Sequence, residues 1–227
     1  MTRVSAIVPV LNEASRVGPL VQSLLRMGIH EVIVVDGGST DGTADHARST
    51  GQCQVLAAPR GRASQMNAGA RVATGTVLWF VHADSQPPPD ALVLIDEVMS
   101  GGDVVAGAFH ILTVADTPGW PARWLRLANV RSYYTRLPYG DQAIFVRRDT
   151  FEQIGGFPVQ PLFEDLELSR RLRRMGRIQT VPRTVIVSGR RFMARPFYYA
   201  FLMNLLPLLY RAGVPASMLA RTYRAVR

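Results

Sequence analysis

The 227-residue sequence contains no lysine, so all 26 of its basic Lys and Arg residues are arginine. A Walker-type phosphate loop needs a lysine and a Schiff-base enzyme needs an amine, so both mechanisms are excluded. The single cysteine, Cys53, excludes an intramolecular disulfide and a cysteine-based zinc cage. The most apolar stretch, residues 196–210, is too short to span a bilayer and is interrupted by Asn204 and Pro207.

Acidic residues are scarce in the second half of the chain. Up to Trp120 there are seven Arg against eleven Asp and Glu, whereas the remainder has nineteen Arg against six acidic residues. An acidic first half suits a site made of carboxylates, and an Arg-rich second half suits phosphates, an anionic acceptor or an anionic membrane surface. Because the chain opens on a strand pattern rather than a signal peptide, we expect a cytoplasmic protein, with the inner face of the membrane as a candidate contact.

Strand and helix patterns alternate along the chain. Short β-branched apolar runs predict strands at Val4–Val10, 31–35, 53–58 and 76–81. Helices are predicted at 15–27 and 62–73. A short helix is also predicted to end at residue 49, and another to begin near residue 90. Further on, strands are predicted at 104–112 and 143–147, and helices at 121–134 and 163–175. The alternation predicts an α/β fold with a mostly parallel central sheet flanked by helices, which binds ligands at the carboxyl ends of its strands.

Polar residues follow three of these strands and are expected to share one rim of the sheet. They are Asn12, Glu13, Asp36, Asp41, His82 and Asp84. Any one loop has an ordinary interpretation, since Asp, Asn, Ser and Gly favour turns. Together they favour a site, because carboxylates at such a rim hold a divalent cation or accept hydrogen bonds from a nucleobase and a ribose.

Five segments carry a resemblance to a known family. In chain order they read PVLNEA, VVDGGSTDGT, RGRASQMNAGA, LWFVHADSQPPP and FEDLELSRRLRRMG. Their order and spacing resemble glycosyltransferase family 2, the inverting enzymes of the GT-A fold. The sequence is most similar to a bacterial branch of small members linked to radical-SAM/selenodomain proteins or to arsenosugar biosynthesis. The resemblance implies one GT-A (Rossmann-like) domain over 1–190, with a basic and apolar helical extension over 191–227 packed on it.

The resemblance also implies which residues hold a nucleotide. Those expected to frame the base are Pro9, Leu11 and Glu13. Asp36 is expected to accept the imide N–H of the base, and Gly37 departs from the family's Asp-Asp-Gly-Ser pattern, so one carboxylate must do this work. In the basic loop, Arg60 or Arg62 is expected to reach the nucleotide, with Asn67 bracing the loop. A solvent-exposed helix start is the alternative for Arg62.

The metal and the catalytic base are implied in the same way. The family's Asp-x-Asp motif appears as His82-Ala83-Asp84, so Asp84 is the expected ligand of a divalent Mn²⁺ or Mg²⁺ bound with the donor. His82 is either a neutral ligand or a packed histidine. The Glu-Asp pair implies Asp165 as the base, with Glu164 orienting it. Helix capping is the alternative for both acidic residues.

Two more segments have expected roles in the site. Asp141 and Gln142 resemble the family's acceptor-side loop, and Arg190 and Arg191 follow a strand-like run at 184–187, where relatives close over the diphosphate. From Arg190 onward the chain has seven Arg and no acidic residue. This end is interpreted as a basic amphipathic helix on an anionic membrane surface, a homodimer face or a core-packing helix.

The predicted function is an inverting, metal-assisted transfer of a sugar from a nucleotide diphosphate sugar, with UDP as the preferred nucleotide, to an unidentified acceptor. A non-catalytic nucleotide-sugar binder is one alternative. A sugar nucleotidyltransferase is another, disfavoured because no glycine-rich loop with a lysine follows the first strand. A nucleic-acid partner is not expected, because no reading module is recognisable and the acidic first half repels a phosphate backbone.

Overall fold

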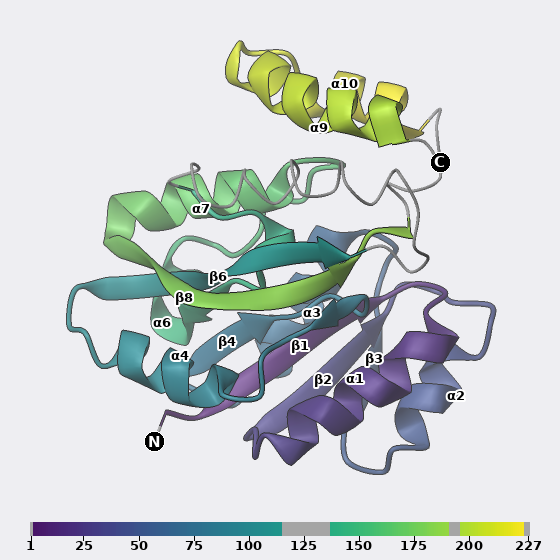
Figure 1. Ribbon diagram of the computed structural model, residues 1–227, viewed down its shortest axis with the longest axis vertical. Helices are drawn as coiled ribbons and strands as arrows, with labels where there is room; N and C mark the ends of the chain where they lie inside the picture. Colours follow the sequence, from purple (N-terminus) through teal and green to yellow (C-terminus); the bar gives the residue numbers. More distant parts are fainter. Residues whose placement is uncertain (1, 115–136, 191–195, 225–227) are drawn as a thin grey trace.

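The computed structural model describes residues 2–114, 137–190 and 196–224. An eight-stranded sheet runs through its centre in the order β3-β2-β1-β4-β7-β6-β8-β5 (Figure 1). The strands are β1 Val4–Val10, β2 Glu31–Asp36, β3 Gln54–Ala57, β4 Val77–Phe80, β5 Ser85–Gln86, β6 Val104–Val114, β7 Phe145–Arg147 and β8 Arg177–Ser188. The helices are α1 Ala14–Arg26, α2 Thr43–Arg48, α3 Arg62–Val72, α4 Ala91–Met99, the 3₁₀ helix η1 Gly140–Gln142, α6 Arg148–Gln153, α7 Glu164–Met175, α9 Pro196–Arg211 and α10 Ala216–Arg224.

The first four strands form the parallel half of the sheet. β1 lies between β2 and β4 and is parallel to both, and β2 is parallel to β3. Every residue of β1 is buried, because helices cover both faces of a sheet of this kind. The predicted α/β fold is therefore confirmed, and the ends of α1, α3 and α7 lie within one residue of their predicted ends.

The sequence did not predict β5 or the full length of β8. Both form by pairing with strands that are distant in the sequence. β5 is a two-residue strand inside the proline-rich loop, and it exists because it pairs with β8. β8 extends well beyond the run at 184–187, but its pairing with β6 shifts register between Val181 and Thr184, around Pro182. A proline cannot donate to the ladder, so its place at a bulge is the expected one. The predicted helix at 121–134 lies outside the described residues.

Helices cover the sheet on both faces and form two separate cores (Figure 1). On one face, α1, α2 and α4 pack against residues that include Val8, Val34 and Trp79. On the other face, α3, α6 and α7 pack against residues that include Ile7 and Phe80. Successive strand residues alternate between these cores. The loops at the carboxyl ends of β1 to β4 therefore lie outside both cores and are available for a site.

A C-terminal hairpin of α9 and α10 lies beside α7, at the top of Figure 1. A third cluster of buried side chains joins it to the rest of the molecule. The members of this cluster are Tyr139, Phe163, Leu166, Leu202, Leu206 and Leu219. The hairpin therefore covers the segment that leads into α7. Within the three described ranges, no helix combines the length and the apolar character needed to cross a membrane.

Candidate active site

The loops that follow β1 and β2 are tied together by side-chain hydrogen bonds. The N–H of Asn12 donates to Ser39 Oγ at 2.9 Å, and the N–H of Thr40 donates to Asn12 Oδ1 at 2.9 Å. Asp36, the last residue of β2, accepts the N–H of Ser39 at 3.1 Å. Asn12 has a φ of 54°, a left-handed conformation that asparagine tolerates better than most residues. These contacts hold both loops in one arrangement at the rim.

Asp41 links the same loops to the first turns of α1 and α2. Its Oδ2 accepts the N–H of Ala14 at 3.1 Å, and its Oδ1 accepts the N–H of Thr43 at 3.0 Å. The Thr43 hydroxyl also donates to Oδ1, and this bond is the main reason why the pKa of Asp41 lies below its ordinary value. The hydroxyl oxygen of Thr43 accepts the N–H of Glu13 at 2.8 Å. Asp41 therefore shapes the rim.

Gln65 of α3 fills the space beside Gly37. Its Nε2 donates to the carbonyl oxygens of Val10 and Val35, both at 2.8 Å, at the ends of β1 and β2. A Cβ added at Gly37 would lie 3.0 Å from Gln65 Oε1, so the buried carboxamide stands where a side chain at residue 37 would go. The glycine in place of a second aspartate therefore has a physical reason in this chain.

Glu13 and Arg190 form an ion pair at the rim. A guanidinium N–H of Arg190 donates to Glu13 Oε1, and Arg16 Nη1 lies 4.0 Å from Glu13 Oε2. The pair joins the segment after β8 to the segment after β1, so the residue expected at the diphosphate lies beside one expected at the base. Pro9 is buried within β1, and Leu11 is half-buried directly after it.

Arg62 begins α3 as an exposed residue, as the alternative interpretation expected, and it also lies in the field of several acidic groups. Desolvation lowers the pKa of the guanidinium, but attraction to Glu164 and Asp165 outweighs that effect and raises the pKa above its ordinary value. Asp84 adds to this attraction, and Tyr223 of α10 lies near enough to add to it once its phenol is ionised. Arg62 therefore lies near acidic residues of the loop after β4 and of the start of α7, and near the end of α10.

Asp165 lies in the first turn of α7, where main-chain groups fix its carboxylate. The N–H of Gly140 donates to Asp165 Oδ2 at 2.7 Å, and the N–H of Leu166 donates to Oδ1 at 2.7 Å. A Cβ added at Gly140 would lie 3.1 Å from His82 Nε2 and 3.2 Å from Asp165 Oδ2. The imidazole of His82 and the carboxylate of Asp165 therefore both lie close to Gly140. Glu164, directly before Asp165, is buried.

Asp84 lies two residues after His82, between β4 and β5. Its carbonyl oxygen accepts the N–H of Ser188 at 3.1 Å, which joins this loop to the end of β8. Across the part of the chain that the structure describes, no group of three or more His, Cys, Asp or Glu side chains is placed to hold a metal ion. A cation at Asp84 would therefore need oxygen ligands from a bound molecule as well.

Two predicted site residues direct their amides to the main chain. Gln142 is buried, donates to the carbonyl of Phe109 at 3.0 Å and accepts the N–H of Tyr139 at 2.9 Å. Asn67 donates to the carbonyl of Phe157 at 2.8 Å and accepts the N–H of the same residue at 3.0 Å. Asn67 therefore braces α3 against the turn after α6. Gln142 fixes the turn at 139–142.

The remaining predicted residues have different positions. Asp141 is half-buried directly after Gly140, so it lies beside the group around Asp165. Arg60 is exposed, two residues before the start of α3. Arg191 lies outside the described residues.

Sequence reasoning missed Gln65 and Tyr223. Gln65 gave a usable signal, because it is a polar residue among the buried positions of α3, next to Met66. Tyr223 gave none, because only the packing of the hairpin brings α10 near Arg62.

Comparison with known proteins places this arrangement in a family. The sequence profile described as Glycosyl transferase family 2 matches residues 5–157. Glycosyltransferase AglE of Haloferax volcanii is 28% identical over 169 residues, which cover 68% of this chain and 56% of that protein. An uncharacterized glycosyltransferase of Mycobacterium tuberculosis is 36% identical over 122 residues, which cover 53% of this chain and 54% of that protein. The chain thus spans about half the length of these relatives.

Solved structures share the fold. The mannosyltransferase PcManGT from Pyrobaculum calidifontis, in complex with GDP-Man and Mn²⁺, has a TM-score of 0.64 at 24% identity, with 82% of this chain and 56% of that chain covered. Glucosyl-3-phosphoglycerate synthase from Mycobacterium tuberculosis, in complex with Mn²⁺, UDP and phosphoglyceric acid, has a TM-score of 0.63 at 18% identity, with 94% and 80% covered. These similarities confirm the GT-A fold. Because the family profile matches more than half of the chain, the protein belongs to glycosyl transferase family 2.

Proposed function

We propose that this protein is an inverting glycosyltransferase that moves a sugar from a nucleotide diphosphate sugar to the hydroxyl of an acceptor. The observation that carries the proposal is the carboxylate of Asp165, which the N–H of Gly140 fixes in the field of Arg62. The names of the relatives support the reaction class. The bound UDP and GDP-Man of the solved structures support a nucleotide-sugar donor, and we propose a UDP-sugar.

The donor is proposed to bind at the rim of β1 and β2. Asp36 accepts the imide N–H of the base at Oδ2, since Oδ1 already takes the hydroxyl and the N–H of Ser39, whereas Oδ2 only shares that N–H. Arg62 and Arg190 face the diphosphate. A guanidinium has five N–H donors, so Arg190 can contact Glu13 and a phosphate together, and its side chain is 37% exposed.

Asp165 is proposed to act as the general base. The acceptor oxygen forms a bond to C1 of the sugar while the bond from C1 to the diphosphate oxygen breaks, and Asp165 takes the proton of the acceptor. The nucleoside diphosphate leaves with the electron pair, and the arginines stabilise its charge. A single displacement of this kind inverts the anomeric carbon. Glu164 is proposed to orient Asp165, and Asp141 to lie on the acceptor side.

A divalent Mn²⁺ or Mg²⁺ ion is proposed to bind together with the donor. Asp84 supplies a hard oxygen ligand and His82 a neutral nitrogen, and the phosphate oxygens would complete the coordination. When bound, such an ion stabilises negative charge on the leaving diphosphate. We prefer Asp84 to His82 as the metal ligand, because the Nε2 atom of His82 lies next to Gly140, on the side of Asp165.

A thermal-shift panel of UDP, GDP and nucleotide sugars, with and without Mn²⁺, tests the proposal. A ligand at a hundred times its Kd adds about 2.7 kcal/mol to the free energy of unfolding, which gives a measurable shift in Tm. We expect stabilisation by UDP and by a UDP-sugar, and a larger shift with Mn²⁺. Binding of a UDP-sugar without any release of UDP would indicate a non-catalytic binder. The absence of any shift with every nucleotide would contradict the proposal.

A further inference from the structure

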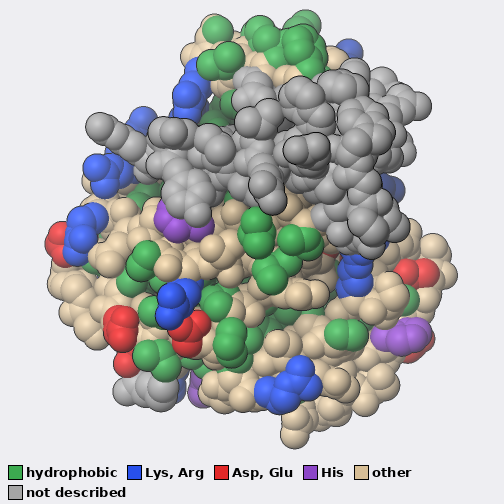
Figure 2. All heavy atoms as spheres, in the orientation of Figure 1, with side chains coloured by type: hydrophobic (Ala, Val, Ile, Leu, Met, Phe, Trp, Pro, Cys, Tyr) green, Lys and Arg blue, Asp and Glu red, His purple; other side chains and the backbone are tan. Residues whose placement is uncertain are grey.

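The outer face of the α9–α10 hairpin carries large hydrophobic side chains in contact with solvent. Phe201, Leu208 and Met218 are 60%, 59% and 62% exposed. Phe201 and Leu208 are seven residues apart, which is about two helical turns, so both lie on one face of α9. Leu202 and Leu206 on the opposite face are buried. Figure 2 shows hydrophobic side chains gathered over the hairpin, at the top of the view.

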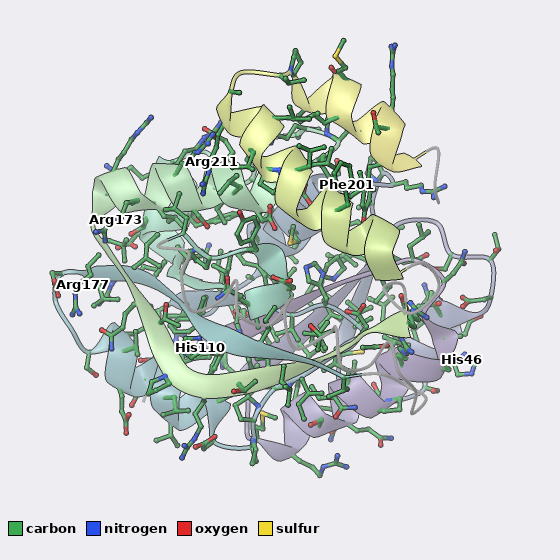
Figure 3. The ribbon with its side chains drawn as sticks, turned by 45° about the horizontal axis from the view of Figure 1, so that its top comes forward. His46, His110, Arg173, Arg177, Phe201 and Arg211 are labelled. Carbon is green, nitrogen blue, oxygen red and sulfur yellow. The ribbon has the colours of Figure 1, made fainter. Side chains whose placement is uncertain are left out.

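Arginines border this apolar face, and neither α9 nor α10 contains an acidic residue. Arg211 follows Leu208 by three residues on α9, and Arg221 follows Met218 by three residues on α10, so each exposed arginine shares a face with an exposed apolar side chain. Figure 3 shows Phe201 and Arg211 on the same helix. From Arg190 to the end of the chain the sequence has seven Arg and no Asp or Glu.

We propose that this outer hairpin face docks on the surface of an anionic lipid bilayer. Phe201, Leu208 and Met218 enter the headgroup region, and Arg211 and Arg221 contact the lipid phosphates. A helix that lies in the interface has this composition, with apolar side chains for burial and basic ones for the anionic surface. The inference is independent of the proposed reaction.

The arginines of this face favour a bilayer as its partner over a second copy of the protein or a nucleic acid. A symmetric dimer buries the same patch of both copies in one interface, so it would bring four arginines into that interface without an acidic residue from α9 or α10. Like charges at close range repel. A nucleic acid would neutralise the arginines but would leave the three apolar side chains in water. An anionic bilayer satisfies both the charged and the apolar residues.

Vesicle sedimentation of the full-length chain tests the proposal. The vesicles contain phosphatidylcholine alone or an equal mixture of phosphatidylcholine and phosphatidylglycerol. We expect the protein to pellet with the mixed vesicles and to stay in the supernatant with phosphatidylcholine alone. High salt should weaken the binding, because the Debye length falls from about 10 Å at 0.1 M to about 3 Å at 1 M.

Matched variants locate the binding face. The triple variant F201Q/L208Q/M218Q should bind the mixed vesicles at least about tenfold more weakly, because its apolar contacts with the headgroup region are lost. V93Q/V159Q, which changes two exposed apolar residues elsewhere, should bind like the wild type. R211Q/R221Q should lose about fivefold for each arginine. R26Q/R71Q removes the same charge from exposed positions at the ends of α1 and α3 and should have little effect.

A spectroscopic measurement tests the same face with a variant that keeps an apolar side chain there and is not expected to weaken membrane binding. Trp fluorescence of the Phe201→Trp variant should be quenched by brominated lipids in the mixed vesicles, beyond the quenching of a Val93→Trp control. Equal quenching of the two variants would contradict the proposal. So would a wild-type protein that stays in the supernatant, hairpin and control variants that bind alike, or a dimer that the triple variant turns into a monomer without vesicle binding. Stabilisation of each variant by UDP is a separate readout, which reports on the proposed donor site alone.

Discussion

The two sides of the proposed site are built in different ways. On the donor side, Asn12, Asp36 and Asp41 hold main-chain N–H groups within two adjacent strand-end loops. On the acceptor side, Asp165 is fixed by Gly140, 25 residues away in sequence, and the hairpin packs on the neighbouring Tyr139 and Phe163. Local motifs therefore set the shape of the proposed donor side, whereas long-range packing sets the position of the proposed base. Changes on the acceptor side should alter turnover and leave donor binding intact.

The largest effect is expected at the base itself. Asp165→Asn keeps the size of the side chain and removes the proton acceptor, so turnover should fall by roughly 10² to 10⁴ while donor binding stays near its wild-type value. Hydrolysis of the donor by water serves as the assay until an acceptor is found.

Asp149→Asn is the matched control. Asp149 lies in the first turn of α6 and, like Asp165, its Oδ1 accepts the N–H of the next residue. Its substitution should leave hydrolysis unchanged. Full activity of the Asp165→Asn variant would refute the assignment and would move the role of base to Asp141 or Glu164.

The second effect concerns the close approach at Gly140. In Gly140→Ala the added methyl would lie 3.1 Å from His82 Nε2 and 3.2 Å from Asp165 Oδ2, so both groups must shift. A displacement of about 1 Å at a reacting group can cost about 10² in rate, and this shift is only a few tenths of an ångström, so turnover should fall by less than that factor with UDP affinity retained. Gly102→Ala is the control, because nothing lies within 4 Å of its added Cβ. Equal activity of the two variants would show that the base does not depend on this contact.

The third prediction tests the donor side. Asp36→Ala should weaken UDP binding by about 5- to 150-fold, because loss of a hydrogen bond to the base costs about 1 to 3 kcal/mol. The change also removes the acceptor of the Ser39 N–H, so the loop loses one of its ties. Asp45→Ala is the control, on the exposed side of α2. Titration of UDP against Tm measures both variants, and unchanged affinity in Asp36→Ala would overturn the assignment.

The fourth prediction separates the two residues proposed near the metal. Asp84→Asn should remove the enhancement of donor binding by Mn²⁺, whereas His82→Ala should only weaken it and should lower turnover more than binding. The reason is that His82 Nε2 lies on the side of Asp165. Donor titrations with and without Mn²⁺ measure the effect. An equal loss in both variants would make His82 a full ligand.

The smallest effect concerns stability away from the site. Burial raises the pKa of Glu31, but hydrogen bonds from Ser5, Thr74 and Gly75 outweigh it, so the pKa is lowered on folding. The stabilisation is therefore complete above the ordinary pKa of about 4.3 and is lost as pH falls toward the lower folded value. Glu31→Gln should reduce the pH dependence of the unfolding free energy in this range. Identical slopes for both proteins would contradict the assignment.

The sequence was a good guide to contacts within the strand-end loops and a poorer one to contacts between distant segments. Parallel strands place Asn12, Asp36 and Asp84 at the same rim, so their proximity follows from the order of the elements. The inward amide of Gln142 depends on Phe109, which is 33 residues away, and the pairing of Glu13 with Arg190 spans 177 residues. Periodicity and local motifs carry no information about such pairs. The position of Tyr223 could not be predicted from the sequence for the same reason, because it depends on how the hairpin packs.

The most direct test of the proposed mechanism is the anomeric configuration of the first sugar released from the donor. The nucleotide sugar that stabilises the protein best is incubated with the protein and Mn²⁺, and the released sugar is followed by proton NMR before it mutarotates. A single displacement by water with Asp165 as the base predicts that an α-linked donor gives the β-sugar first, at a rate that Asp165→Asn lowers by roughly 10² or more. Release of the α-sugar first would contradict inversion by one base.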